Sequence, residues 1–154
     1  MTKNKINPEL IRIDHIRIIK SNISVSNQYA DYPEKPYRIV VQHKQNTASD
    51  LENKMIRIRL NTILEGRNKT EDKLGITGEF NIEFHMFVEN LPDFIVKEDS
   101  QEKISSDMGS TLMGIVYSTA RGIILERTQG TYLNGVILPV INPQILIKEN
   151  QSTQ

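Results

Sequence analysis

The residues of this chain best suited to acid–base or metal chemistry are its three histidines, His15, His43 and His85. Each falls on a different predicted strand, and no two have the short spacing that a paired metal site requires. This distribution is more typical of surface or strand-edge histidines than of zinc ligands. We therefore predict no metal site and no bound cofactor.

Other catalytic patterns are no stronger. The glycine-containing residues 75–78 lack the helix and lysine that follow a phosphate-binding loop. Nothing local marks a serine nucleophile, and the carboxylates are scattered without a pair prone to burial. Arg57 and Arg59 alternate with apolar residues and have no aromatic platform beside them, which predicts a solvated sheet face and no nucleic-acid partner. The sequence therefore predicts that the protein is not an enzyme.

Composition excludes further classes of protein. The chain has 154 residues, enough for one domain, and its 19 basic and 19 acidic residues cancel, so no global field attracts nucleic acid or an anionic membrane. Cysteine is absent, which excludes disulfides and fits a reducing compartment. The first residues lack the apolar core of a secretory signal, and no apolar run approaches the roughly 20 residues of a membrane helix. We expect a cytoplasmic protein without membrane insertion.

Four strands are predicted in the first two-thirds of the chain. Residues 56–64 and 80–88 alternate between apolar and polar side chains, as in a half-covered antiparallel sheet, and residues 37–43 form a shorter strand. Residues 11–25 also alternate, but their phase slips twice, which predicts a bulge or kink near residues 14–15 or 20–21.

The segments between these strands predict a meander. Residues 46–50 are rich in turn formers, and residues 65–72 are polar and read as a hairpin loop. Residues 97–107 are charged, and we expect an exposed, mobile crossover there.

A long helix is predicted to begin between Ser106 and Ser110 and to continue to Arg127, with Gly130 just beyond its end. One of its faces is apolar and would cover the sheet. A second stripe is rich in small residues and consists of Gly114, Ile115, Ser118, Gly122 and Leu125. A glycine inside a helix costs about 1 kcal/mol relative to alanine, which close contact with another helix would offset. Packing within the chain is the alternative, but no second helix of comparable size is predicted, so we expect a subunit interface.

The whole chain, residues 1–154, is thus predicted to be one α+β domain. A four-stranded antiparallel meander is covered by one long C-terminal helix and a short terminal element. Residues 130–147 carry more apolar surface than a connector needs, which is typical of a binding surface. We expect the polar residues 1–9 and 148–154 to be flexible.

In this order of elements the sequence resembles the SecB family of protein-export chaperones. Residues 130–132 (Gly-Thr-Tyr), followed at fixed distance by residues 138–140 (Leu-Pro-Val), resemble the family's Gly-Thr-aromatic and Pro-Val motifs. Tyr117 with residues 120–121 (Ala-Arg) resembles its Tyr-Ala-Arg helix signature, although here two residues intervene. The resemblance covers most of the chain.

The resemblance implies an ATP-independent holdase that binds unfolded or extended client polypeptides in apolar grooves. It also implies a homotetramer, a dimer of dimers in which strands extend the sheet and long helices pack together. By the same mapping the client-binding residues are Tyr132, Leu133, Val136, Leu138, Val140, Ile141, Phe94 and Ile95. The alternative is that these side chains simply cover the sheet, because a core and a groove share the same composition.

The chain also departs from the family's pattern. Glu79 matches an acidic sheet residue that docks the translocase motor SecA, but the acidic positions of the first strand are Asn22 and Ser26 here, and the terminal element is short. A chaperone with another partner, for example one dedicated to an antitoxin, is therefore equally open. A second class of function is a non-catalytic binding module for one folded partner or a small apolar ligand.

Overall fold

The computed structural model describes residues 4–26 and 35–149, so the outermost parts of the two predicted flexible ends, residues 1–3 and 150–154, lie outside the described residues. The four long strands are β1 (Ile11–Val25), β2 (Arg38–Asp50), β3 (Met55–Arg67) and β4 (Lys73–Val88). A short hairpin consists of β5 (Ile95–Glu98) and β6 (Gln101–Ile104), and the helices are α2 (Ser106–Arg127) and α3 (Pro143–Glu149). Two 3-10 turns, η1 (Pro8–Leu10) and η2 (Leu91–Phe94), precede β1 and β5.

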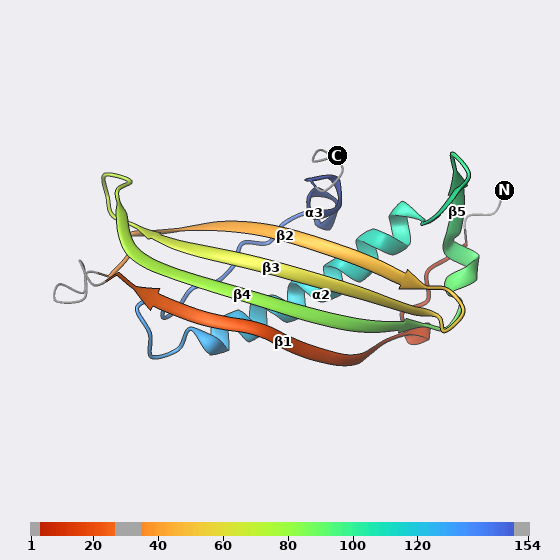
Figure 1. The fold of residues 1–154 in the computed structure, drawn as a ribbon, viewed down its shortest axis with the longest axis horizontal. Helices are drawn as coiled ribbons and strands as arrows, with labels where there is room; N and C mark the ends of the chain where they lie inside the picture. Colours follow the sequence, from red (N-terminus) through yellow and green to blue (C-terminus); the bar gives the residue numbers. More distant parts are fainter. Residues whose placement is uncertain (1–3, 27–34, 150–154) are drawn as a thin grey trace.

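The four-stranded antiparallel α+β fold is as predicted, but its strand order is β1-β4-β3-β2 (Figure 1). Strands β2, β3 and β4 form a meander, whereas β1 pairs with β4 and lies at the opposite edge from β2. The expectation of a meander through all four strands was therefore wrong. The side chains explain why β2 lies at an edge: from Gln45 to Ser49, its residues on the helix side are polar, so this half of β2 has little to bury.

Strand β2 is longer than predicted. Residues 46–50, interpreted as a turn, continue β2 and pair with Met55–Arg59. The turn follows at residues 51–54, where Asp50 accepts hydrogen bonds from the backbone and the side chain of Asn53 at 3.1 and 2.8 Å. Turn-forming residues are tolerated in this strand because one of its edges is unpaired.

Strand β1 contains the two predicted irregularities. Its register against β4 shifts between Ile13 and His15 and again between Ile18 and Lys20. The first shift is where the sequence predicted it, and the second is one residue earlier. The two bulges leave Ile13, Ile16 and Ile18 on the same side of the sheet, the side that faces α2.

The predicted crossover is a hairpin rather than an irregular segment. Asp99 and Ser100 form its turn with φ of +48° and +65°, as in the primed turns that join two tightly paired strands. The side chains of β5 and β6 are mostly exposed, as predicted. Helix α2 then begins at Ser106, and the Ser105 side chain caps it by accepting a hydrogen bond from the backbone of Met108.

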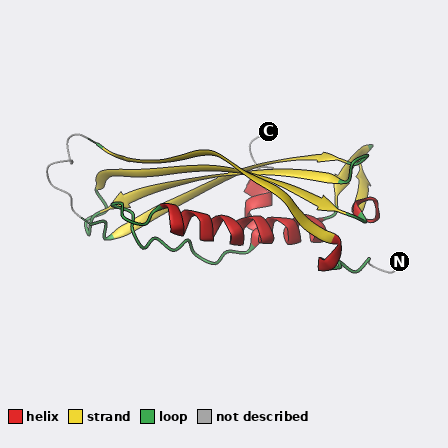
Figure 2. Ribbon diagram, turned by 90° about the horizontal axis from the view of Figure 1, so that it is seen from below, coloured by secondary structure: helices red, strands yellow, loops and turns green. Residues whose placement is uncertain are grey.

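The core lies between α2 and the two central strands. Figure 2 shows α2 lying along one face of the sheet, while no described element covers the other face. On β3 and β4 the residues that face α2 are fully buried, as in Ile58, Phe80 and Phe84, whereas β1 and β2 contribute no fully buried side chain. The helix thus covers the middle of the sheet and leaves both edges accessible.

Candidate functional site

A groove runs between the free edge strand β2 and the segment that follows α2. Its walls are the first residues of β2 and residues 134–139, and it encloses about 780 Å³. Three large apolar side chains are exposed in or beside it: Tyr37 (68%), Ile137 (69%) and Val140 (83%). Exposed apolar surface at an unpaired strand edge is typical of a binding surface.

The segment that forms the outer wall of this groove is attached to α2 by two hydrogen bonds. The Tyr117 hydroxyl donates to the carbonyl of Pro139 at 2.7 Å, and Nε of Arg121 donates to the carbonyl of Leu138 at 2.9 Å. Burial raises the pKa of Tyr117, so its hydroxyl remains a donor at neutral pH. These two hydrogen bonds therefore fix the segment against the helix.

Two smaller hollows lie near the other half of β2. The first, of about 150 Å³, is lined by apolar side chains of β3, β6, α2 and α3 together with Gln45 and Thr47 of β2. The second lies between the β5–β6 hairpin and α3, and the two share Ile104 and Ile147. The first is smaller than the roughly 300–1,000 Å³ of typical small-molecule sites. It is large enough for single apolar side chains.

Together these features suit an extended polypeptide. A strand laid beside β2 could pair with its unpaired backbone, and alternate side chains could enter the apolar hollows. Helix α3 lies near the middle of this path, since its Leu146 carbonyl accepts a hydrogen bond from Gln45 of β2 at 3.4 Å. The groove and the two hollows are hereafter called the β2 groove system.

The predicted client-binding residues fall into two groups. Tyr132 and Val140 are exposed, Ile141 and Ile95 are half-buried, and Val136 lines the groove although it is only 7% exposed. Leu133, Leu138 and Phe94 are part of the core.

The structure does not bring all of these residues together. Phe94 comes directly before the β5–β6 hairpin and Ile95 is its first residue, at the opposite end of the sheet from the residues just after α2 (Figure 1). Their role in client binding stays a prediction.

Sequence reasoning missed several residues that line these hollows. Tyr37, Ile137, Ile104 and Ile147 were not among the predicted site residues. The signal that could have found Tyr37 is the edge position of β2, because an aromatic residue at the start of an edge strand has no neighbouring strand to cover it. That position follows from the strand order, which the sequence does not reveal.

The small-residue stripe of α2 lies on the side that faces away from the sheet. Ser118 and Gly122 are exposed, and a side chain at Gly122 would meet nothing within 4 Å. Ile115 and Leu125 are half-buried. Gly114 differs, because a Cβ added at this position would lie 3.5 Å from Pro143 of α3. The predicted subunit role of the stripe is untested, and one end of it is in contact with α3 within the chain.

A second apolar strip lies at the β1 edge. Ile13, Ile16 and Ile18 are 36–38% exposed although they face the helix side, and Ile19, at the second bulge, is 47% exposed. Helix α2 packs over β3 and β4, so these isoleucines are left at the margin of the core.

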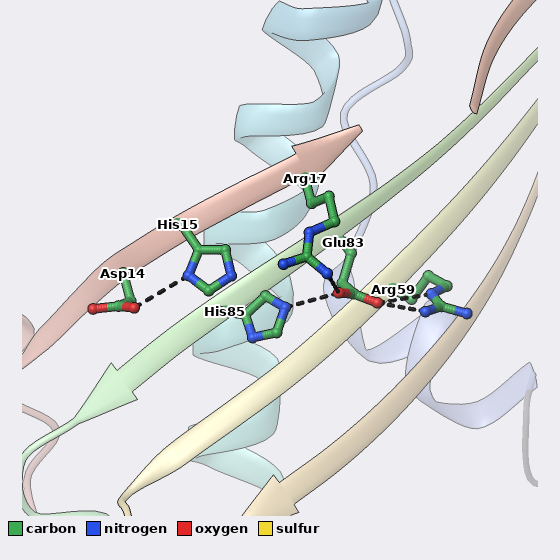
Figure 3. A network of polar contacts seen from close by, with 6 residues as sticks. All are labelled: Asp14, His15, Arg17, Arg59, Glu83 and His85. Atoms are coloured by element: carbon green, nitrogen blue, oxygen red, sulfur yellow. Dashed lines mark hydrogen bonds and ion pairs between the residues drawn. The ribbon is translucent and has the colours of Figure 1, made fainter. Parts of the chain in front are cut away.

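The uncovered face of the sheet carries a polar cluster, shown in Figure 3, that the sequence analysis did not anticipate. Glu83 points to this open face, yet it is only 3% exposed. Nε and a terminal nitrogen of Arg59 donate to Oε2 of Glu83 at 3.1 and 2.5 Å. Nε2 of His85 lies 2.8 Å from Oε1, and a terminal nitrogen of Arg17 lies 3.8 Å from the same oxygen. Arg59, which was predicted to lie on a solvated face, is 42% exposed, but it also covers the Glu83 carboxylate, which was not predicted.

The same contacts lower the pKa of Glu83 to about 2, first through the hydrogen bond from Arg59 and then through that from His85. Two of the three histidines also meet here. The rings of His15 and His85 stack with centroids 4.0 Å apart, and His15 contacts Asp14 at 3.1 Å. Histidines distant in sequence are thus neighbours across β1 and β4.

Glu79, the predicted SecA-docking residue, lies on the same open face. It is half-buried and forms an ion pair with Lys20 of β1. Its charge is therefore compensated within the chain.

Residues 4–26 and 35–149 lack two further features. Within them, no three histidine, cysteine, aspartate or glutamate side chains are grouped so that they could hold a metal ion. No helix in these ranges is long and apolar enough to cross a membrane.

No protein-family model matches the sequence, and no curated protein matches it either. The fold does have solved counterparts. A SecB-like chaperone of Mycobacterium tuberculosis, solved in complex with a ChAD peptide from the HigA1 antitoxin, matches 86% of this chain and 91% of its own, with a TM-score of 0.60 and 13% identity. A Streptococcus agalactiae protein of unknown function covers 84% of this chain and 97% of its own, with a TM-score of 0.46 and 13% identity. The predicted SecB-like fold is confirmed by the first match.

Proposed function

We propose that this chain is a SecB-like, ATP-independent chaperone that holds extended client polypeptides in the β2 groove system. The observation that carries the proposal is the exposed apolar surface along an unpaired edge strand, formed by Tyr37, Ile137 and Val140. A client strand would add backbone hydrogen bonds to β2 and place alternate side chains in the hollows. No nucleotide is needed, because binding only the unfolded client holds it away from folding and aggregation by mass action.

The structural counterpart supports a polypeptide as the ligand. The Mycobacterium tuberculosis protein of similar fold was solved with an antitoxin peptide, which makes an antitoxin-like dedicated client as reasonable as general export clients. The enclosed hollow, about 150 Å³, is smaller than a typical small-molecule site, whereas the open groove of about 780 Å³ is not.

We also propose that the protein self-associates through two surfaces. The isoleucines at the β1 edge would be covered by a neighbouring subunit, and the exposed part of the α2 stripe, Ser118 and Gly122, would meet a second helix. Two such surfaces are sufficient for a dimer of dimers.

Docking of SecA at Glu79 stays a prediction. The ion pair with Lys20 and the cations around Glu83 make this face unlike an acidic docking surface. A role in export is likewise a prediction that follows from the family resemblance, and a cytoplasmic location is a prediction from the composition.

The function is tested by the aggregation of a slowly folding client, followed by light scattering without ATP. We expect the chain to suppress aggregation, and Ile137→Asp to reduce the affinity for the unfolded client by about tenfold. Ile145→Asp is the matched control, because Ile145 is 48% exposed but does not line the β2 groove system. Failure to suppress aggregation, or binding confined to one native protein, would replace the holdase with the binding module.

Assembly is tested by multi-angle light scattering. We expect a mass near four chains, and a lower mass for Gly122→Leu, because a bulky side chain would prevent close approach of helices. Gly122 is a better probe than Gly114, where a bulky residue would also displace Pro143. Glu126→Leu, an exposed position near the end of the same helix, serves as the control. An unchanged mass for Gly122→Leu would remove the stripe from the interface.

A further inference from the structure

The open face of the sheet concentrates positive charge in a chain whose net charge is zero. The strand register places six cationic side chains on the half of this face nearest the β5–β6 hairpin. We call this half the basic face, defined by Arg12, Arg17, Lys20, Lys44, Arg57 and Arg59. The histidine pair of His15 and His85 lies among them.

Only some of these charges are compensated within the chain. Lys20 is paired with Glu79, and Arg59 with Glu83, which Arg17 also approaches at 3.8 Å. No carboxylate of the described residues pairs with Arg12, Lys44 or Arg57. Arg12 instead lies over the ring of Phe87, with 4.1 Å between the guanidinium and the ring centroid.

Arg57 is the most informative of the uncompensated cations. Its Nε is buried and has no hydrogen-bond partner among residues 4–26 and 35–149, which is costly for a charged donor. Its neighbour on β2 is the small residue Ala48, and Ala48, Arg57 and His85 line a hollow on this face. Asp50 lines the same hollow as a second, negatively charged group, and its carboxylate accepts two hydrogen bonds from Asn53 of the turn.

We propose that the basic face docks an extended, acidic polypeptide segment, with one carboxylate of that segment in the hollow beside Arg57. A guanidinium can bind a carboxylate through two parallel hydrogen bonds from its two terminal nitrogens, so the ligand need not reach the buried Nε. This surface is distinct from the β2 groove system, so the proposal does not depend on the holdase.

The spacing of the cations specifies the segment further. Arg57 and Arg59 are two residues apart on one strand, which places them about 6.8 Å apart. Alternate side chains of an extended peptide have the same spacing. The side chains of Arg59 and Arg17 contact Glu83 but are still 42% and 62% exposed. Their solvent-facing nitrogens can therefore bind a second carboxylate of the peptide. The basic face therefore fits an acidic–x–acidic pattern.

Nucleic acid fits this face less well. Proteins that bind single strands stack the bases on exposed aromatic rings, but the aromatic residue placed by the register among the six cations, Phe87, is capped by Arg12. Glu83, at the centre of the face, also interrupts any continuous track for phosphates.

The test uses fluorescence anisotropy with the full chain and three labelled probes. These are a 12-residue peptide of alternating glutamate and serine, the same peptide with glutamine in place of glutamate, and a 12-nucleotide oligo-dT. We expect the acidic peptide to bind at low salt, and Arg57→Gln to weaken it about tenfold. Lys97→Gln, which removes one positive charge on the β5–β6 hairpin, should leave binding unchanged.

Further outcomes separate this proposal from the others. Ile137→Asp should bind the acidic peptide as the parent chain does, and Arg57→Gln should still suppress aggregation. Arg57→Lys, which keeps the charge without the paired donors, should bind with intermediate affinity and covers the case in which Arg57→Gln does not fold. Equal binding of the glutamine peptide, or no effect of either Arg57 substitution, would overturn the proposal. Tighter binding of oligo-dT with the same dependence on Arg57 would reassign the face to nucleic acid.

Discussion

At the scale of single residues, Glu83 is the most unusual group in the molecule. It is an acidic side chain on an open sheet face, yet Arg59, Arg17 and His85 cover it almost completely. A carboxylate held in this way stabilises the fold only while it is ionised. Stability and pH are therefore linked at this position.

We predict that the unfolding free energy falls as the pH drops from about 4.5 toward 2. The ordinary pKa of Glu83, 4.5, is lowered to about 2 in the fold, so its contribution is complete above the ordinary value and is lost as the pH falls through the folded one. Glu83→Gln should flatten this part of the profile and, at neutral pH, lower the unfolding free energy by roughly 1–3 kcal/mol because it loses charged hydrogen bonds. Urea denaturation across this pH range measures both.

Glu89→Gln is the matched control for that prediction. Glu89 is exposed and, among the described residues, its side chain forms no ion pair or hydrogen bond. Its replacement should leave the fall in unfolding free energy between about pH 4.5 and 2 unchanged. If both substitutions flatten the profile equally, the linkage does not arise at Glu83.

Tyr117 is the second residue with a testable local role. Tyr117→Phe removes the hydrogen bond to the Pro139 carbonyl and should lower the unfolding free energy by about 0.5–1.5 kcal/mol. Amide exchange in residues 134–141 should accelerate, because that segment loses an anchor to α2. Tyr132→Phe, at an exposed tyrosine, should change neither quantity. Unchanged exchange in Tyr117→Phe would mean that Arg121 alone holds the segment.

At the scale of elements, the short helix α3 contributes a buried side chain, Leu146, to the core. Leu146 is 3% exposed, while its neighbour Ile145 is 48% exposed. Leu146→Ala should therefore lower the unfolding free energy by roughly 2–4 kcal/mol, and Ile145→Ala by less than about 1 kcal/mol. Guanidinium denaturation of the two variants measures the difference. Equal effects would show that α3 is not docked as described.

Some elements could be predicted from the sequence because their signals are local. The phase slips of β1 located both bulges to within one residue, since side-chain alternation is read along a single strand. The limits of α2, Ser106 and Arg127, were as predicted from its apolar face, although the serine that caps it is Ser105, one residue before the predicted range.

Strand order and the β2 extension could not be predicted, because pairing joins residues that are distant along the chain. The position of β1 beside β4 follows from neither strand alone. The β5–β6 hairpin was missed because its strands are charged and exposed, so alternation gives no signal, and its turn is formed by Asp99 and Ser100 at positive φ. The covering of Glu83 was missed for the same reason as the strand order, since Arg17, Arg59 and His85 come from three strands.

At the scale of the whole molecule, the two faces of the sheet differ in character. One is apolar and covered by α2, and the other is polar and carries the basic face. A chain with no net charge can therefore present a strong local field.

This asymmetry predicts chromatographic behaviour that net charge does not. At pH 7 and low salt the protein should be retained on a cation exchanger despite a formal net charge of zero. Arg57→Gln should elute at lower salt than Lys97→Gln, although both remove one positive charge. Identical elution of the two variants would mean that the charges do not act as a patch.

The attachment of residues 134–141 to α2 has an evolutionary consequence. Both anchors, from Tyr117 and Arg121, reach main-chain carbonyls, which every amino acid possesses. The exposed side chains of that stretch, such as Ile137 and Val140, can therefore be replaced without loss of either anchor. Substitutions in this stretch would alter the surface that it displays while its backbone stays attached to α2.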